Sequence, residues 1–166
     1  MIKRPPGLFF LPGRLMKLKK LNDNFFNQNK HLVEVLDKDH QGNWDGEKTR
    51  GYGVVVISCA GGLTFGIPLR SRIKHKACFR TINDAGLDYS KAVLINDPAH
   101  LAGPFIIPSD QYVKIADREA FITDRFEKYV NRYILGVQRG DQNILKHYPY
   151  STLQNYHMEL GLPAGT

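Results

Sequence analysis

The stretch GYGVVVISCAGGLTFGIPLR, residues 51–70, carries the clearest structural signal in the chain. Two β-rich runs, 52–59 and 63–69, flank the dipeptide Gly61-Gly62, which is the short-range signature of a β-hairpin. The nearly continuous Val-Val-Val-Ile run predicts that the hairpin is buried on both faces or nearly so. Pro68 should lie at the end of its strand, because proline has no N–H to donate to the ladder. Whatever follows Leu69 is then presented from the end of a central strand.

A basic loop follows this hairpin. Residues 67–80 read IPLRSRIKHKACFR and contain no acid; the cationic positions are Arg70, Arg72, Lys74, Lys76 and Arg80, with Ser71 and His75 between them. Such a loop repels itself unless an anion binds to it, and the densest biological anion is a phosphate backbone. A solvated basic loop without a ligand is the alternative. The hydroxyl and the imidazole within the cluster favour a site that acts on RNA phosphates.

Shorter patterns predict the elements before the hairpin. Residues 16–21 alternate partly between apolar and basic side chains, which predicts an edge strand. Asn22 or Asp23 is the expected N-cap of a helix that starts there. Residues 32–36 form a short apolar run compatible with either a helix or a strand. Residues 37–51 are typical of a surface loop, in which we expect Trp44 to cover an edge of the core.

After the basic loop the pattern predicts more strands and then helices. Strands are expected at 77–82, 92–95, 105–107 and 112–115. The apolar spacing then becomes helical, with Asp117 as N-cap, Glu119 in the first turn, Arg139 in the last turn and Gly140 after it. A final short helix should begin at Ser151 and end near residue 161. Together these elements predict an α+β fold, a small twisted antiparallel β-barrel with one long and several short helices packed on it.

The length of 166 residues suits one domain with a core of its own. We expect this domain to span residues 16–166, with residues 1–15 as an extension outside the fold, because three prolines interrupt their apolar patch. No apolar run approaches the roughly 20 residues that cross a bilayer. The two cysteines, Cys59 and Cys78, suggest buried thiols and not a disulfide framework. The expected location is the cytoplasm.

The charge of the chain favours an acidic partner. The formal net charge is +7, which points to nucleic acid or to an anionic membrane surface. Residues 34–47 oppose this trend with five acids against one lysine. This acidic stretch argues against a protein that nucleic acid covers on all sides.

No metal or nucleotide-cofactor motif is recognisable. The six histidines show no H-E-x-x-H spacing, the cysteines show no C-x-x-C spacing, and no glycine-rich phosphate loop joins a strand to a helix. We therefore expect neither a metal nor a cofactor. The residues instead suit metal-free cleavage of RNA, in which the RNA supplies its own 2′-hydroxyl as the nucleophile.

Such cleavage needs a base for the 2′-hydroxyl proton, an acid for the leaving 5′-oxygen, and cations or donors around the phosphorane. His75 is the natural candidate for proton transfer, because a free imidazole has a pKa of about 6.5. Ser71 and Lys74 are candidates for stabilising the phosphorane, and Tyr52 or a lysine is an alternative base. The residues expected to bind RNA are Arg50, Arg70, Arg72, Lys76, Arg80, Lys91, Lys17 and Lys19.

Asp88 belongs to a second polar group, Asp-Tyr-Ser-Lys at residues 88–91, that enters a predicted strand. Its carboxylate is expected to position Lys91 or His75, or to cap a turn. The sequence leaves these three roles open.

The runs RGYGVVVI, GGLTFGIPLRSRIKHK and GLDYSKAVLI within residues 50–95 resemble the toxins of type III toxin–antitoxin systems, the ToxN/AbiQ group. The chain as a whole is most similar to the TenpN branch. The Tyr-Gly-Val start of the central strand, the Pro-Leu-x-Ser loop entry and the following Lys-His carry the resemblance. Ser71 matches the serine of the Thr-Ser pair in ToxN, whereas Arg70 replaces its threonine. Ile73 replaces a lysine, so that Lys74 is the nearest lysine.

The resemblance implies a barrel like that of the MazF and Kid endoribonucleases. It also implies metal-independent cleavage that leaves a 2′,3′-cyclic phosphate and a 5′-hydroxyl. The inhibitor would be a small RNA antitoxin made of pseudoknot repeats and not a protein, and toxin and RNA would close into a ring of several copies. The expected protein is thus a bacterial endoribonuclease toxin of the kind that acts in abortive infection and phage defence.

Two other functions remain open from the sequence. A non-catalytic RNA-binding module would use the same basic loop and aromatic residues without cutting its ligand. A membrane-surface protein would use the basic N-terminus, but the prolines there break any amphipathic helix.

Overall fold

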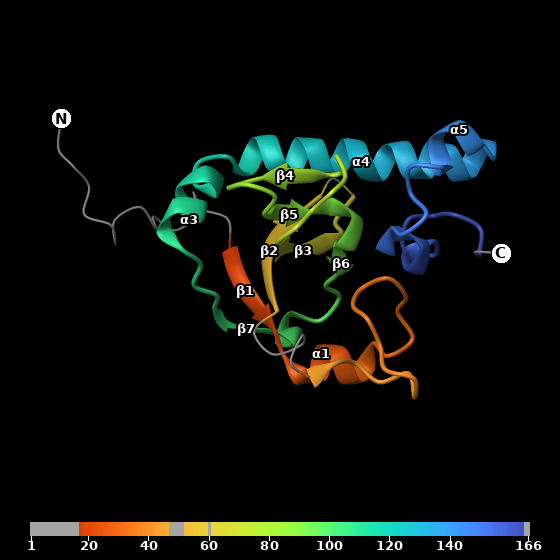
Figure 1. Cartoon of the computed structure of the whole chain (residues 1–166). Helices are drawn as coiled ribbons and strands as arrows, with labels where there is room; N and C mark the ends of the chain where they lie inside the picture. The colour runs from red at the N-terminus through yellow and green to blue at the C-terminus, as the bar shows by residue number, and fades with distance from the viewer. Residues whose placement is uncertain (1–16, 47–51, 60, 165–166) are drawn as a thin grey trace.

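The computed structural model describes residues 17–46, 52–59 and 61–164 (Figure 1). The predicted extension, residues 1–15, therefore lies outside the described residues. The elements are β1 (Lys17–Leu21), α1 (Asp23–Gln28), β2 (Gly53–Ser58), β3 (Thr64–Arg70), β4 (Cys78–Arg80), β5 (Gly86–Asp88), η2 (Tyr89–Lys91), β6 (Val93–Leu94), η3 (Pro98–His100), β7 (Leu101–Pro104), α3 (Ser109–Ile115), α4 (Glu119–Arg139), α5 (Gln142–Leu145) and η4 (Thr152–Tyr156).

The predicted hairpin is confirmed and forms the middle of the sheet. β2 and β3 pair antiparallel, with Val54 opposite Pro68. Gly61 and Gly62 in the turn have φ values of 91° and 84°, a region that favours glycine. Val54 and Val55 are fully buried, in agreement with the continuous apolar run.

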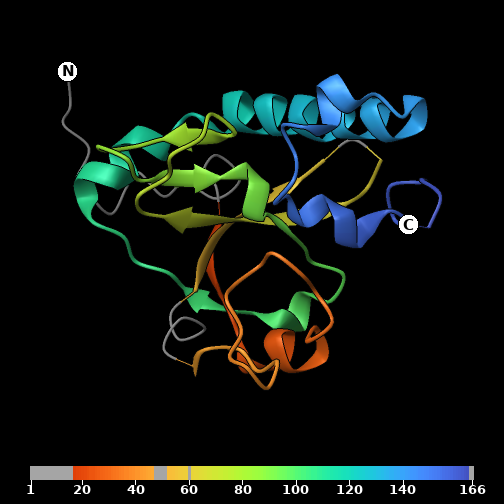
Figure 2. The ribbon, with the colours of Figure 1, turned by 45° about the vertical axis from the view of Figure 1, so that its right-hand side comes forward.

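The described strands form one antiparallel sheet in the order β4-β5-β3-β2-β1-β7, with β6 beside β3. The α+β class with an antiparallel sheet is confirmed. The predicted closure into a barrel is wrong for the described strands, since β4 and β7 at the two ends of the order do not pair. Figures 1 and 2 show β1 running across the direction of β4 and β5, so the sheet is strongly twisted.

Two positions in the sheet differ from expectation. β1 is not an edge strand, because β7 pairs with its outer side. Pro68 lies inside β3 and not at its end. On the side of β3 away from β2, β6 pairs with Phe65 and Gly66, and β5 pairs with Leu69 and Arg70. Pro68 falls between these two pairings, where a missing N–H is tolerated.

The long helix is confirmed as α4, and its apolar face builds the core. Ile122 and Phe126 are fully buried, and the Phe126 ring lies 5.1 Å from the ring of Phe65 in β3. Gly140 ends the helix with φ 59° in the left-handed region, as predicted. The predicted N-cap at Asp117 is wrong, because Arg118 occupies that position without a side-chain cap.

The strands predicted at 105–107 and 112–115 are wrong. The strand in this region is β7, Leu101–Pro104, and residues 109–115 form α3 directly after Pro108. Pro108 occupies the N-cap of α3, where no intrahelical hydrogen bond needs its missing N–H, and its carbonyl accepts the Tyr112 N–H at 3.0 Å in the first turn of the helix. Pro108 therefore marks the start of a helix and not, as predicted, the end of a strand.

Local hydrogen bonds hold α1 and the loop that follows it. The Asn22 side chain accepts the Phe25 N–H at 3.1 Å and caps α1, as predicted. The indole N–H of Trp44 donates to the Phe26 carbonyl at 2.9 Å, so Trp44 covers an edge of the core. Residues 32–36 form an irregular loop and neither a helix nor a strand. The C-terminal helix begins after the predicted Ser151 cap, as the short 3-10 helix η4.

Cys59 and Cys78 are free, partly buried thiols. Burial raises the pKa of Cys59 to about 11. Within the described residues, no helix combines the length and the apolar character needed to span a bilayer.

The contact between β4 and β5 gives a test of this fold. In Gly86→Ala the added Cβ would overlap the Phe79 carbonyl oxygen and lie 2.9 Å from Cα of Arg80, so that the two strands must separate. We expect the free energy of unfolding in urea to fall by about 1–3 kcal/mol or more. Gly103→Ala in β7 is the control, because no atom lies within 4 Å of its added Cβ. Equal stabilities of the two variants would contradict the β4–β5 pairing.

Candidate functional site

The basic loop after β3 is anchored from within the protein. Ile73 is buried, and its N–H donates to the Asp84 carbonyl at 2.8 Å. The Arg80 guanidinium donates to the carbonyl oxygens of Ile73 and His75, both at 3.1 Å, and pairs with Asp84 at 3.6 Å. Arg80, which was expected to bind RNA, thus shapes the loop that carries the other candidates.

This loop brings His75 to the carboxylate of Asp88. Nε2 of His75 lies 3.3 Å from Oδ1 of Asp88 and 3.4 Å from Oγ of Ser90. Nδ1 accepts the Ala77 N–H at 3.1 Å. Because a backbone N–H can only donate, Nδ1 is the unprotonated nitrogen, and the ring proton lies on Nε2 toward the carboxylate. The ring is oriented by both nitrogens, although 44% of the side chain is exposed.

Asp88 is the buried centre of the cluster, with 5% of its side chain exposed. Its Oδ1 accepts the Ser90 N–H at 3.0 Å and the Ser90 hydroxyl at 2.6 Å. Its Oδ2 lies 3.9 Å from Nε of Arg70. Of the three roles that the sequence left open, Asp88 performs two, because it caps the turn of η2 and holds His75.

Lys91 has other partners. Its ammonium pairs with Glu34 at 3.2 Å and donates to the Tyr150 carbonyl at 3.0 Å. The Asn155 amide, near the C-terminus, accepts the Val33 N–H at 2.9 Å and donates to the Val33 carbonyl at 2.8 Å. These contacts tie the loop after α1 to the C-terminal region. Residues 33–38 of the loop after α1, together with Arg70 and Lys91, line a hollow of about 400 Å³.

Tyr52 is buried, and the charges of Arg70 and Asp88 act on its phenol group. Its ring stands edge-on to Phe26 at 5.7 Å, and its hydroxyl has no hydrogen-bond partner among the described residues. Burial raises the pKa of Tyr52 well above its ordinary value, Arg70 opposes this, and Asp88 adds to it. The phenol therefore stays protonated near neutral pH, where it can donate a hydrogen bond but is a poor base.

Ser71 is separated from the His75 cluster. Successive side chains of a strand point to opposite faces, and Ser71 follows Arg70 at the end of β3. Ser71 and Arg72 line a second hollow of about 370 Å³ with Asn83 and Gln111, whereas Arg70 lines the first. Of the four predicted catalytic residues, only Ser71 lines either hollow; Tyr52, Lys74 and His75 line neither of them.

The remaining predicted cations differ in availability. Arg72, Lys74 and Lys76 are exposed, and their side chains have no ion pair or hydrogen bond with the described part of the chain. Lys17 and Lys19 lie in β1, which β2 separates from β3. Arg50 lies outside the described residues.

Ser90 was missed by the sequence analysis, although it contacts both His75 and Asp88. The signal was present in the Asp-x-Ser spacing of residues 88–90. An aspartate often accepts the N–H of the second residue after it, which forms an Asx turn and fixes that residue beside the carboxylate.

Comparison with known proteins finds no family model, no curated protein and no solved structure that matches this chain. Across the described residues, no three His, Cys, Asp or Glu side chains form a group that could hold a metal ion. The site is therefore defined by geometry alone, as an oriented imidazole, a buried carboxylate and exposed cations.

Tyr52→Phe tests the unpaired phenol. The variant keeps the ring contact with Phe26 and removes a hydroxyl that has no hydrogen-bond partner among the described residues, so we expect its free energy of unfolding to be unchanged or raised by up to about 1 kcal/mol. Tyr148→Phe is the control, because the Tyr148 hydroxyl donates to the Tyr129 carbonyl at 2.8 Å. This control should lose about 1–3 kcal/mol. A comparable loss in Tyr52→Phe would mean that the Tyr52 hydroxyl has a partner.

Proposed function

We propose that this protein is a metal-independent endoribonuclease that cleaves RNA by attack of a 2′-hydroxyl on the adjacent phosphate. The observation that carries the proposal is the contact of His75 with the buried Asp88, at 3.3 Å, within an exposed cationic loop. A carboxylate behind an imidazole fixes the ring and stabilises the imidazolium that forms when a proton is transferred. Lys74 and Lys76 supply positive charge for phosphate binding around it.

The reaction exchanges one bond at phosphorus for another. The 2′-oxygen bonds to phosphorus, and the bond from phosphorus to the 5′-oxygen breaks, which leaves a 2′,3′-cyclic phosphate and a 5′-hydroxyl. We assign the base to Nδ1 of His75, because Asp88 faces Nε2. The Ala77 N–H, now 3.1 Å from Nδ1, is replaced by the RNA hydroxyl, whose proton Nδ1 takes. Lys74 returns a proton to the leaving 5′-oxygen.

The biological setting that we propose is a bacterial, cytoplasmic type III toxin–antitoxin system. Its support is the resemblance of residues 50–95 to the ToxN/AbiQ toxins, together with the net charge of +7. The partner is then an RNA antitoxin made of pseudoknot repeats, which the toxin cuts from a longer transcript and retains in a closed ring. Short tandem repeats directly upstream of the reading frame are expected, and their absence would contradict this setting.

A second candidate is a non-catalytic RNA-binding module. This candidate is favoured because both ring nitrogens of His75 already have partners within the protein. Nδ1 accepts the Ala77 N–H, and Nε2 faces Asp88. In this function His75 is a structural residue that shapes the loop, and Lys74 and Lys76 only hold phosphates.

Incubation of the purified protein with total RNA in excess EDTA separates the two functions. The nuclease is expected to yield fragments with 5′-hydroxyl and 2′,3′-cyclic phosphate ends, which RNA ligation after end treatment identifies. The binding module shifts the RNA in a gel and leaves it whole. Whole RNA after prolonged incubation at saturating protein would contradict the proposed activity.

Substitutions in the cluster test the assigned roles. His75→Gln keeps a donor of similar reach but cannot transfer a proton, so the single-turnover cleavage rate should fall by about 10²–10⁴-fold. Asp88→Asn and Lys74→Ala should each lower the rate by about 10²-fold. Lys30→Gln, which removes one exposed charge from the turn after α1, is the control and should leave the rate nearly unchanged.

Ser71→Ala tests the resemblance separately from the geometry. Ser71 lies in the second hollow, so its loss should leave the His75 cluster intact. If Ser71→Ala abolishes cleavage while His75→Gln reduces it only a few-fold, the catalytic centre lies in the second hollow and the assignment to His75 is wrong.

A further inference from the structure

α4 carries positive charge on one flank and negative charge on the other. Its arginines recur every seven residues, at Arg118 directly before the helix and at Arg125, Arg132 and Arg139 within it. Residues seven apart on an α-helix share a face with a drift of only about 20°. At about 1.5 Å per residue the arginines stand about 10 Å apart along the axis. We call these four residues the arginine row.

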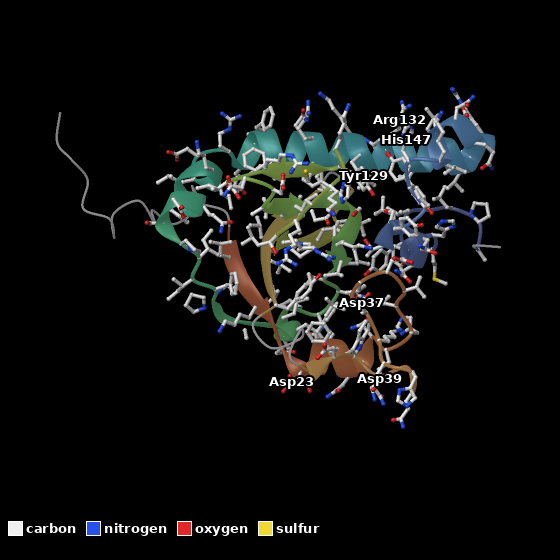
Figure 3. The ribbon with its side chains drawn as sticks, viewed as in Figure 1. Asp23, Asp37, Asp39, Tyr129, Arg132 and His147 are labelled. Atoms are coloured by element: carbon white, nitrogen blue, oxygen red, sulfur yellow. The ribbon has the colours of Figure 1, made fainter. Side chains whose placement is uncertain are left out.

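The arginine row is exposed and electrically uncompensated. All four side chains are exposed, and none has a carboxylate partner in the described part of the chain. Figure 3 shows Arg132 at the outer surface of α4, beyond Tyr129. Four unpaired guanidinium groups on one helix repel each other, which favours a bound polyanion.

An exposed aromatic ring joins the arginine row to the basic loop. The guanidinium carbons of Arg118 and Arg125 lie 4.7 Å and 5.5 Å from the centre of the Phe121 ring, which belongs to a residue that is 42% exposed. The same ring stands edge-on to Phe79 in β4 at 6.0 Å. Because β4 follows the loop that carries Lys74 and His75, positive charge continues from that loop onto α4.

The opposite flank of α4 restricts where a polyanion can lie. Asp117, Glu119, Asp124 and Glu127 line a hollow of about 620 Å³ there, together with Ser58. These carboxylates repel phosphates. A nucleic-acid strand that leaves the loop is therefore directed along the arginine side of the helix.

We propose that the arginine row is a binding track for the sugar-phosphate backbone of single-stranded RNA that extends from the basic loop along α4. Guanidinium groups bind phosphates in a bidentate manner, and their regular spacing suits a repeating backbone. A single strand fits better than a duplex, because unpaired bases can stack on the guanidinium planes of Arg118 and Arg125, which lie over the Phe121 ring. The choice of RNA as the ligand rests on the proposed function.

The test is the salt dependence of binding to a fluorescent 2′-O-methyl RNA of about 16 nucleotides, a length within the known range of single-strand site sizes. This RNA lacks the nucleophile, so binding is measured whether or not the protein is a nuclease. Log K falls as log salt rises. In the triple variant Arg125→Gln, Arg132→Gln and Arg139→Gln this negative slope should become shallower by about 2, at about 0.7 per lost phosphate contact. Replacement of the same three arginines by lysine should retain most of the slope.

A matched control removes the same net charge elsewhere. Lys20→Gln, Lys30→Gln and Lys114→Gln change three exposed lysines, none of which lies on α4. The control should keep the wild-type slope. An unchanged slope in the arginine variant, or an equal fall in both triple variants, would overturn the track.

The outcomes also separate this inference from the proposed function. If the arginine variant loses slope and the wild-type protein leaves ordinary RNA whole, the track stands and the nuclease proposal fails. If the arginine variant keeps the slope and the wild-type protein cuts RNA, the track fails and the nuclease stands. Absence of any binding to the 2′-O-methyl RNA would overturn the track.

Discussion

A buried carboxylate organises the region where this protein is most charged. A carboxylate with almost no exposure is unfavourable unless donors and cations surround it. Asp88 meets this requirement with the Ser90 N–H and hydroxyl, the ring of His75 and the guanidinium of Arg70. These partners come from the end of β3, the basic loop and η2. One charge thereby fixes three segments of the chain relative to each other.

The loop that Asp88 holds also depends on Arg80. The guanidinium of Arg80 donates to the loop carbonyls of Ile73 and His75, and the buried side chain of Ile73 anchors the loop in the core. Arg72 beside this anchor has φ 57°, a conformation that costs a residue with a side chain about 1–3 kcal/mol. The loop is therefore an ordered structure held against local strain, which is suited to presenting Lys74 and His75 in a fixed geometry.

Local signals made the hairpin, α4 and the cap of α1 predictable from the sequence, because the glycine turn, the helical period and the Asn22 cap each act within a few residues. Barrel closure was not predictable, since it depends on whether the two outer strands meet. The site was recovered in part. His75 and Asp88 were both singled out, but their contact joins residues thirteen positions apart, and no periodic pattern reports it. The separation of Ser71 from His75 follows from strand alternation at Arg70, a detail that needs the end of β3 to be known.

The wall of the hollow beside Arg70 has a consequence for folding. Val33 and Asn155, which hydrogen-bond to each other, are separated by 122 positions in the sequence, and the same loop meets Lys91 through Glu34. Contacts between such distant residues carry a large loop-closure entropy and tend to form late and slowly. The hairpin and the basic loop, whose contacts are short in sequence, can form before this wall. During synthesis on the ribosome, the contact between Val33 and Asn155 can form only after residue 155 has been added, later than the residues of the hairpin and of the basic loop.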